Sequence, residues 1–267
     1  MRTDVFKEVT AQRNQALWLL LGFQSGFMNA GGFLACHQFV SHMTGYGTTV
    51  GVSIGTGDYI RSFELALAPL FFLAGAAYAG WLVDRRLILG LEPRLEAGIL
   101  TLAIMNVAVF VGDASGLFGP FGEPLVMQRD FLLLFCLCFA CGLQNGLFTG
   151  LTEGKVRTTH MTGPTTDIGL TLAKVFTLHR GDPERGKLTR LNLLRVKIVV
   201  AFSGGSLIAA LVFQQITFEG FAIPAATSLF VLWYVRRLLR VGGPESPDQV
   251  VQSLLIPDEP SHAAKVG

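Results

Sequence analysis

Long stretches without a charged residue are the feature that most limits what this 267-residue chain can fold into. Only 15% of its residues are Asp, Glu, Lys or Arg, whereas soluble domains carry about a quarter. Six stretches contain none of these residues: 14–57, 65–83, 97–112, 131–152, 198–218 and 220–235. A membrane-spanning helix needs about 20 mostly apolar residues. A soluble enzyme can contain one such stretch but hardly six, so the sequence predicts an all-α integral membrane protein.

The basic residues indicate how the chain crosses the membrane, because Lys and Arg are enriched in cytoplasmic loops. They cluster at the N-terminus and at residues 84–94, 174–197 and 236–240, whereas the segment 113–130 holds three acids and one arginine. Placing every basic cluster inside predicts six spans with both termini in the cytoplasm. The six predicted spans are 16–36, 65–83, 96–113, 131–151, 197–216 and 220–236.

Two short segments remain, "GYGTTVGVSIGTG" (45–57) and "GPTTDIGLTLAKVF" (163–176). If both crossed the membrane, giving eight full spans, the basic loop 84–94 would lie outside. The charge pattern therefore favours two short broken or re-entrant helices, which are tolerated at membrane depth where protein or water surrounds them.

The two halves of the chain repeat each other. "GFQSGFM" (22–28) matches "GLQNGLF" (142–148), and "HMTG" occurs at 42–45 and again at 160–163. Each half has three full spans, an odd number, so the second half is inverted relative to the first, as in many transporters. The predicted organisation is a cytoplasmic N-terminal segment 1–13, a first repeat 14–113, an outer linker 114–130, a second repeat 131–240 and a disordered tail 241–267.

Each His-Met-Thr-Gly motif is expected to mark a helix N-terminus, and inversion is expected to place the two copies face to face. Thr44 is expected to cap a helix that begins at Gly45, and Thr162 or Gly163 to cap the second. Helix starts attract anions, and a histidine can donate a hydrogen bond or take up a proton. The candidate solute-binding residues of the motifs are His42, Thr44, Gly45, His160, Thr162 and Gly163. Close helix packing by small residues is the alternative interpretation.

Four further polar residues join the candidate site: Gln24, Gln144, Asn145 and Asp167. Amide side chains in hydrocarbon need partners, and those of Gln24 and Gln144 are expected on the opposite repeat. Gln144 and Asn145 are adjacent, so they cannot both point the same way. An acid inside a membrane segment is by default a functional hypothesis; Asp167 is expected to accept a proton, to pair with Arg157 or His160, or to cap its helix.

Catalytic, metal-binding and cofactor signals are weak. Cys138 and Cys141 form a C-x-x-C, but neither a second cysteine pair nor a histidine pair completes a metal site, and the sequence favours packing roles for both. Common catalytic motifs are missing from the sequence, so no catalytic residue, metal or cofactor is predicted. A net charge of +2 is too small to suggest a nucleic-acid partner.

The stretches "GFQSGFMNAGGFLACHQFVSHMTG" and "CGLQNGLFTGLTEGKVRTTHMTG" resemble the signature regions of the YoaK-like family of bacterial membrane proteins, a domain of unknown function. The resemblance covers about residues 14 to 240 and implies a multi-span inner-membrane protein without implying a substrate. Many relatives have an Asn after the first Met-Thr-Gly or an acid near the end of the first span, where this chain has Tyr46 and Asn29.

Three functions are compatible with these features. A transporter or channel for a small polar or anionic solute is favoured by the inverted repeat. A membrane-embedded enzyme acting on a lipid-linked substrate, with histidine as acid or base, is the second. A membrane scaffold or sensor that binds a partner through its basic loop 178–197 is the third. The lipid bilayer is the one partner that the composition itself predicts, and self-association into a homo-oligomer stays open.

Overall fold

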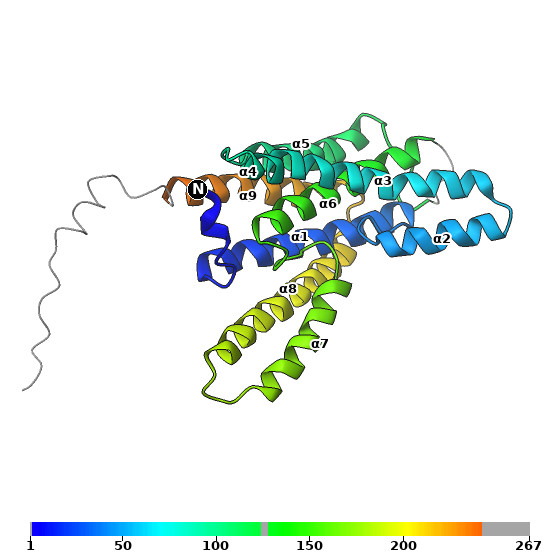
Figure 1. The fold of residues 1–267 in the computed structure, drawn as a ribbon. Coiled ribbons are helices and arrows are strands. Elements are labelled where there is room, and N and C mark those ends of the chain that lie inside the picture. Colours follow the sequence, from blue (N-terminus) through cyan, green and yellow to red (C-terminus); the bar gives the residue numbers. More distant parts are fainter. Residues whose placement is uncertain (1, 124–127, 242–267) are drawn as a thin grey trace, which may run out of the picture.

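The computed structural model describes residues 2–123 and 128–241, and most of them lie in helices (Figure 1). Within these residues, six helices are long and apolar enough to cross a membrane. They are Gln12–Cys36, Tyr59–Ile88, Leu95–Ala114, Phe131–Leu151, Pro183–Phe213 and Phe218–Arg240. This confirms an all-α protein with six candidate membrane spans. The tail predicted to be disordered lies outside the described residues, apart from its first residue.

In chain order the elements are η1 (Arg2–Phe6), α1 (Gln12–Cys36), α2 (Met43–Gly55), α3 (Tyr59–Leu82), α4 (Asp84–Ile88), α5 (Leu95–Ala114), α6 (Gln128–Leu151), α7 (Thr162–Thr177), α8 (Pro183–Phe213), η2 (Phe218–Phe221) and α9 (Ala222–Val241). The first repeat therefore contains α1, α2, α3 and α5, and the second contains α6, α7, α8 and α9. The start of α1 and the end of α9 lie at the same end of the bundle (Figure 1).

Two of the helices begin earlier than the charge-free stretches indicate. The span predicted to begin at residue 197 starts as a helix at Pro183, and α3 also begins ahead of its apolar run. A capping aspartate explains each start: Asp182 accepts a hydrogen bond from the backbone N–H of Glu184 (2.8 Å), and Asp58 caps α3 in the same way. A charge-free stretch indicates which part of a helix is apolar, whereas the capping residue marks where the helix begins.

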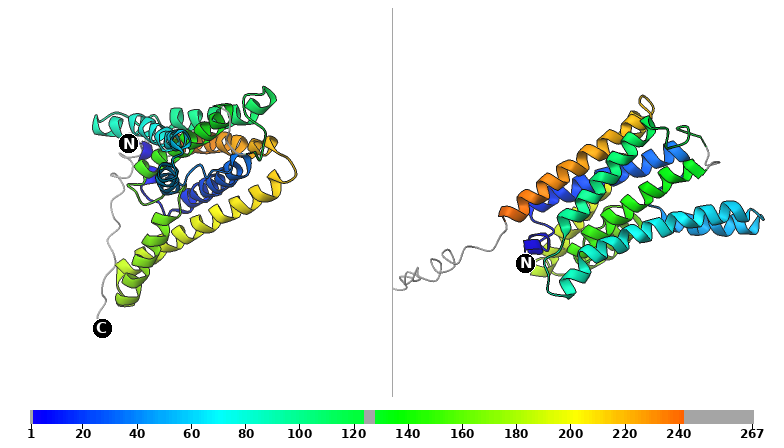
Figure 2. Two further views of the ribbon diagram at one scale, coloured as in Figure 1. Left: turned by 90° about the vertical axis from the view of Figure 1, so that its right-hand side faces the viewer. Right: turned by 90° about the horizontal axis from the view of Figure 1, so that it is seen from above.

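The long helices of the two repeats pack in exchanged pairs. Helix α1 packs along α8, and its repeat mate α6 packs along α3, while α5 and α9 pack against each other. Every one of these pairs joins one repeat to the other. Three of the six spans belong to each repeat, so α6 crosses in the opposite direction to α1 (Figure 2). The inverted repeat is thus a pair of interlocked halves rather than two separate domains.

Glycines allow α1 and α8 to approach closely. Gly22 and Gly26 lie one turn apart on α1, and a Cβ atom added to Gly26 would collide with the backbone carbonyl of Phe202 on α8. The contact is reciprocal, because a Cβ on Gly205 of α8 would collide with the carbonyl of Phe23. Small residues at helix contacts are the usual means by which membrane helices pack.

The pair α6–α3 repeats this contact. A Cβ on Gly142 of α6 would collide with the carbonyl of Phe72, and a Cβ on Gly75 of α3 with the carbonyl of Phe139. Gly142 is the repeat mate of Gly22 in the stretches "GLQNG" and "GFQSG". The glycines of the duplicated stretch therefore hold each repeat's first span against a span of the other repeat.

The short helices α2 and α7 are present where the sequence predicts them, but they do not meet. Helix α2 packs on the first half of α3, and α7 packs on the first half of α8. The α2–α3 hairpin extends beyond the ends of the other spans, whereas the α7–α8 hairpin leaves the bundle obliquely (Figures 1 and 2). The prediction that the two motif helices lie face to face is therefore wrong, because each short helix covers its apolar side with the next span of its own repeat.

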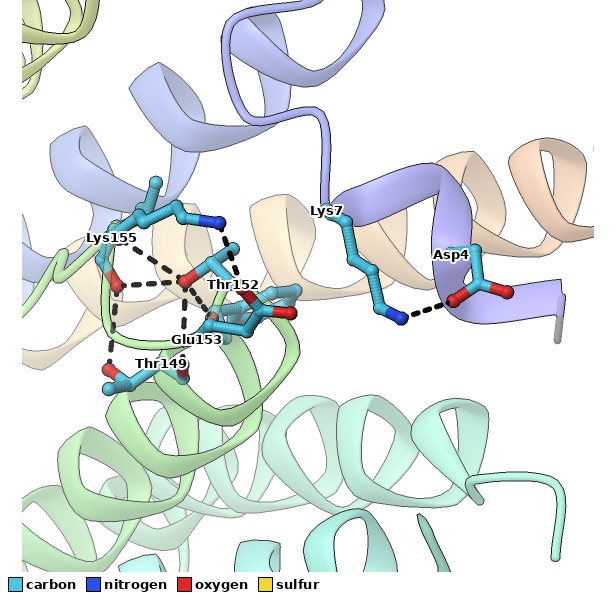
Figure 3. Close-up of polar contacts among 8 residues, drawn as sticks. Asp4, Lys7, Thr149, Thr152, Glu153 and Lys155 are labelled. Atoms are coloured by element: carbon cyan, nitrogen blue, oxygen red, sulfur yellow. Dashed lines mark hydrogen bonds and ion pairs between the residues drawn. The ribbon is translucent and has the colours of Figure 1, made fainter. Parts of the chain in front are cut away.

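The N-terminal segment folds back on the start of α1. The Asn14 side chain donates hydrogen bonds to the carbonyls of Val5 (2.7 Å) and Glu8 (2.9 Å), and the Trp18 indole donates to Val9 (3.0 Å). Asp4 and Lys7 form an ion pair on this segment (Figure 3). These contacts fix the first residues of the chain to the end of the bundle.

Candidate functional site

The repeated pattern G-x-Q-x-G determines which way the two glutamines face. Successive residues of an α-helix are about 100° apart, so Gln24 lies roughly opposite Gly22 and Gly26 on α1. With its glycine face against α8, α1 directs Gln24 at α6, and the same pattern directs Gln144 of α6 at α1. Both side chains are buried, and Nε2 of Gln24 donates a hydrogen bond to Oε1 of Gln144 (3.1 Å). The expected partner on the opposite repeat is confirmed.

The last spans of the two repeats add polar groups to this pair. Nε2 of Gln24 also donates to Oγ of Ser228 on α9 (3.0 Å), and Oγ1 of Thr227 donates to Oε1 of Gln24 (2.7 Å). Nδ2 of Asn106 on α5 donates to the same Ser228 Oγ (2.8 Å). Gln24 and Gln144 are repeat mates, 120 residues apart, and Asn106 and Ser228 lie on the last spans of the two repeats, α5 and α9.

Gln144 connects the pair to the loop before the second motif. Its Nε2 lies within hydrogen-bond distance of the Leu21 carbonyl (3.0 Å), Ser25 Oγ (2.7 Å) and Thr158 Oγ1 (3.2 Å). We call the whole set the central polar cluster; its members are Gln24, Ser25, Asn106, Gln144, Thr158, Thr227 and Ser228. Every member is uncharged, and four helices of both repeats contribute to it. Because unpaired amides are costly in hydrocarbon, the cluster also stabilises the contact between the repeats.

The first His-Met-Thr-Gly motif lies at the far end of α1. Asn29 Oδ1 accepts hydrogen bonds from the backbone N–H (3.1 Å) and the hydroxyl (3.0 Å) of Ser41, which holds the loop against α1. Helix α2 begins at Met43 with exposed His42 as its N-cap, and no side chain caps it. Thr44 therefore lies within the first turn, and its predicted capping role is wrong.

A cavity of about 310 Å³ opens beside this motif. Its wall is aromatic and imidazole-rich, since the rings of Phe33 and Phe39 stack at 4.5 Å and the ring of His42 meets Phe39 edge-on. The lining residues are Phe33, His37, Gln38, Phe39, His42, Gly45, Tyr46 and Thr49.

A folded loop leads from α6 to the second motif (Figure 3). The hydroxyl of Thr152 donates to the Phe148 carbonyl (2.7 Å) and accepts from the Val156 N–H (3.2 Å). Glu153 at the turn has a positive φ of 53° and pairs with Lys155 on the surface (2.9 Å). The loop thus delivers Thr158 to the central polar cluster.

At the second motif, α7 begins at Thr162 with Met161 as its N-cap, so neither Thr162 nor Gly163 caps it as predicted. Asp167 forms an ion pair with Arg195 of α8 (3.1 Å), and Arg195 also donates to Thr171 Oγ1 (3.1 Å). The partner of Asp167 is therefore Arg195, and not Arg157 or His160.

The surroundings of the second motif are compact and basic. A cavity of about 10 Å³ lies between the loop, α7 and α8, with Arg157, Asp167 and Arg195 among its lining residues. A space of that size holds about one water molecule. Burial, reinforced by the positive charge of Arg157, holds the pKa of the nearby His160 below its usual range.

The structure therefore divides the predicted site residues into three groups. Gln24 and Gln144 meet at the centre, the first motif lies at one end of the bundle, and the second motif lies on the loop and helix that follow α6. Asn145 faces away from Gln144 and accepts only a long hydrogen bond from Thr149 (3.4 Å), as their adjacency predicts. The sequence missed Asn106, Thr158, Thr227, Ser228 and Arg195. Two of these residues, Asn106 and Ser228, could have been found from the sequence, because each is a polar residue within an apolar span.

Cys36, Cys138 and Cys141 are buried free thiols. Among residues 2–123 and 128–241 there is no group of three or more His, Cys, Asp and Glu side chains arranged to hold a metal ion. The C-x-x-C of α6 lies in the packed interior beside Tyr46 of α2, whose ring is also buried.

These features define a multi-span helical membrane protein built as an inverted repeat around an uncharged polar centre. The chain belongs to the family described as protein of unknown function (DUF1275), which matches residues 17–234. This membership is consistent with the YoaK-like resemblance of its two motif regions. Neither a curated protein nor a solved structure matches the chain.

Proposed function

We propose that this protein carries a small polar solute across the membrane, with the solute site at the central polar cluster. The observation on which the proposal chiefly rests is the Gln24–Gln144 hydrogen bond, which joins repeat mates inside the membrane-spanning bundle. Transporters built from inverted repeats place their sites near the midplane, between the repeats. A polar cluster contributed by both repeats at that position supports the same arrangement here.

The two motif loops are the proposed entrances to this site. His42, Thr44 and Gly45 stand at the first entrance, and His160, Thr162, Gly163 and Asp167 at the second. The two entrances differ in openness although their sequences match, with cavities of about 310 Å³ and 10 Å³. Alternating access between two inverted halves requires that equivalent elements differ in conformation, so that one entrance is open while the other is closed.

The Asp167–Arg195 ion pair is the proposed closure of the narrower entrance. It joins α7 to α8, whereas the repeat mate of Asp167 is Thr49, which forms no ion pair. Breaking this pair would free the start of α7 from α8. Burial and the positive charge of Arg157 lower the pKa of His160, so its protonation requires a lower pH than that of an ordinary histidine.

We further propose a bacterial inner-membrane location with both termini in the cytoplasm. The two ends of the described chain lie at one end of the bundle, together with α4 and its arginines (Figure 1). Reporter fusions at each terminus test the orientation: cytoplasmic activity at both ends is expected, and an outward-facing reporter at either end would exclude it.

Flux measurements on reconstituted protein test the transport proposal. Vesicles containing the wild-type protein are expected to take up at least one member of a panel of polar and anionic solutes faster than empty vesicles. Gln144→Leu is expected to abolish this uptake, whereas Asn145→Leu on the next residue of the same helix should retain it. Uptake equal to that of empty vesicles for every solute, or unaffected by Gln144→Leu, would reject the proposal.

A further inference from the structure

Asn106 in the central polar cluster has an unused hydrogen-bond acceptor. Its side chain is 1% exposed, and its Nδ2 donates to Ser228 Oγ (2.8 Å). Its Oδ1 is buried and has no hydrogen-bond partner. A buried polar atom without a partner costs about 1–3 kcal/mol, and such atoms are rare enough to need an explanation.

The glutamine amides near Asn106 are bonded to other partners. Gln24 of the first repeat donates to Ser228 of the second (3.0 Å). Gln144 directs its Nε2 at Leu21, Ser25 and Thr158. Both glutamine amides are therefore engaged elsewhere, and Oδ1 of Asn106 is left for a donor from outside the described chain.

An unpaired acceptor alone does not define a site, as Asn192 shows. Its Oδ1 is also buried without a partner, while its Nδ2 donates to the Ile168 carbonyl (3.2 Å). Asn192, however, lies between α7 and α8 of one repeat, where no other amide or hydroxyl group hydrogen-bonds to it in the described chain. Asn106 differs because it donates a hydrogen bond to Ser228 of α9, which also accepts one from Gln24 of α1. Polar side chains of three helices therefore meet at Asn106.

The central polar cluster has no charged side chain, and this limits the net charge that a bound solute can carry. All members of the cluster except the loop residue Thr158 come from the charge-free stretches 14–57, 97–112, 131–152 and 220–235. The acids of the ion pairs Asp167–Arg195 and Glu96–Arg236 are 43% and 47% exposed, and the largely buried Arg195 is neutralised by its pairing with Asp167. An anion placed among uncharged amides at low dielectric would lack a countercharge, which costs several kcal/mol. A neutral solute with amide or hydroxyl groups meets no such penalty.

We infer that the central site binds an uncharged solute carrying an amide or hydroxyl group, and that Oδ1 of Asn106 accepts a hydrogen bond from it. This inference rests on the proposed function and narrows it, because it excludes the anionic solutes that helix starts alone would favour. The side-chain oxygens of Gln24 and Gln144, each of which accepts one hydrogen bond, are the neighbouring acceptors.

Lactamide and lactate are a suitable pair of probes, since they share size and hydroxyl group and differ in charge. Vesicles containing the full-length wild-type protein are expected to take up lactamide at least tenfold faster than lactate, each corrected for empty vesicles. Asn106→Leu is expected to lose the lactamide uptake. Asn192→Leu, which removes the same kind of unpaired acceptor outside the centre, should retain it.

Binding is measured separately, so that a folding defect or a lack of transport leaves the inference testable. Lactamide is expected to raise the thermal unfolding midpoint of the detergent-solubilised wild-type and Asn192→Leu proteins, but not that of the small polar variant Asn106→Ser. Lactamide binding without uptake would support the inference while removing the proposed function. Preferential uptake of lactate, or binding of lactamide that is unaffected by Asn106→Ser, would overturn the inference while leaving transport in place. Neither binding nor uptake of lactamide would also overturn it.

Discussion

Gln24 and Gln144 occupy the same place in the two halves of the chain, and their amides are hydrogen-bonded to each other at 3.1 Å. Each lies opposite the glycines that pack its helix against the other repeat. One face of a duplicated helix thus provides close packing, and the other provides the polar centre.

Removing either glutamine should destabilise the protein through the groups left unpaired. Gln24→Leu leaves Gln144 Oε1 and the Thr227 hydroxyl without this partner, and we expect a loss of about 1–3 kcal/mol. The double variant Gln24→Leu/Gln144→Leu should lose less than the sum of the single variants. Denaturant unfolding in detergent measures the difference, with Asn145→Leu as control. Strictly additive losses would show that the two amides do not interact.

Two adjacent glycines of α8 provide a matched test of the close helix contact. A Cβ on Gly205 would collide with the Phe23 carbonyl, whereas a Cβ on Gly204 would meet nothing within 4 Å. Gly205→Ala should therefore lower the thermal unfolding midpoint. Gly204→Ala should leave it unchanged or raise it, since Ala favours a helix over Gly by up to about 1 kcal/mol. Equal effects of the two substitutions would contradict the α1–α8 packing.

Stability should depend on pH through His160. Its pKa in the folded protein lies below the unfolded value, so the unfolded chain binds more protons as the pH falls through about 6.5. Folding stability is therefore expected to decrease between about pH 7 and pH 5, and His160→Gln should reduce that decrease. Thermal unfolding across this range measures it, with exposed His42→Gln as control. An unchanged pH profile for His160→Gln would contradict the assignment.

The ion pair between α7 and α8 should control the mobility of α7. Asp167→Asn removes the charge that holds Arg195, so hydrogen exchange across residues 162–177 is expected to accelerate several-fold. Glu153→Gln, which breaks the surface pair with Lys155, should leave this exchange unchanged. Identical exchange in wild type and Asp167→Asn would show that the pair does not hold the hairpin.

Much of the fold could be predicted from the sequence because helices that cross a membrane must be apolar, and apolar stretches are visible in the sequence. The lack of charge identifies the spans, and an odd number of spans in each repeat determines the inversion. The Gln24–Gln144 contact was also predictable, since a buried amide needs a partner and the duplication offers one. Asn106 and Ser228 were missed because they lie in the last spans, outside the stretches in which the two repeats match letter by letter.

The predicted meeting of the motifs failed for a geometric reason. A duplication makes two elements equivalent by rotation, but repeat mates come together only where they lie near the rotation axis. Gln24 and Gln144 do, whereas the motif helices α2 and α7 pack on the next spans of their own repeats. Arg195 escaped prediction because its pairing with Asp167 depends on how α7 and α8 align across a long turn.

Side-specific labelling tests the inverted arrangement most directly. Thr44 and Thr162 are exposed repeat mates at the two motif loops, and each is replaced by cysteine in a protein whose four native cysteines have been substituted. A membrane-impermeant maleimide applied to intact cells and to inverted vesicles is expected to label the two positions from opposite sides. Labelling of both positions from the same side would contradict the inverted repeat and the transport pathway proposed from it.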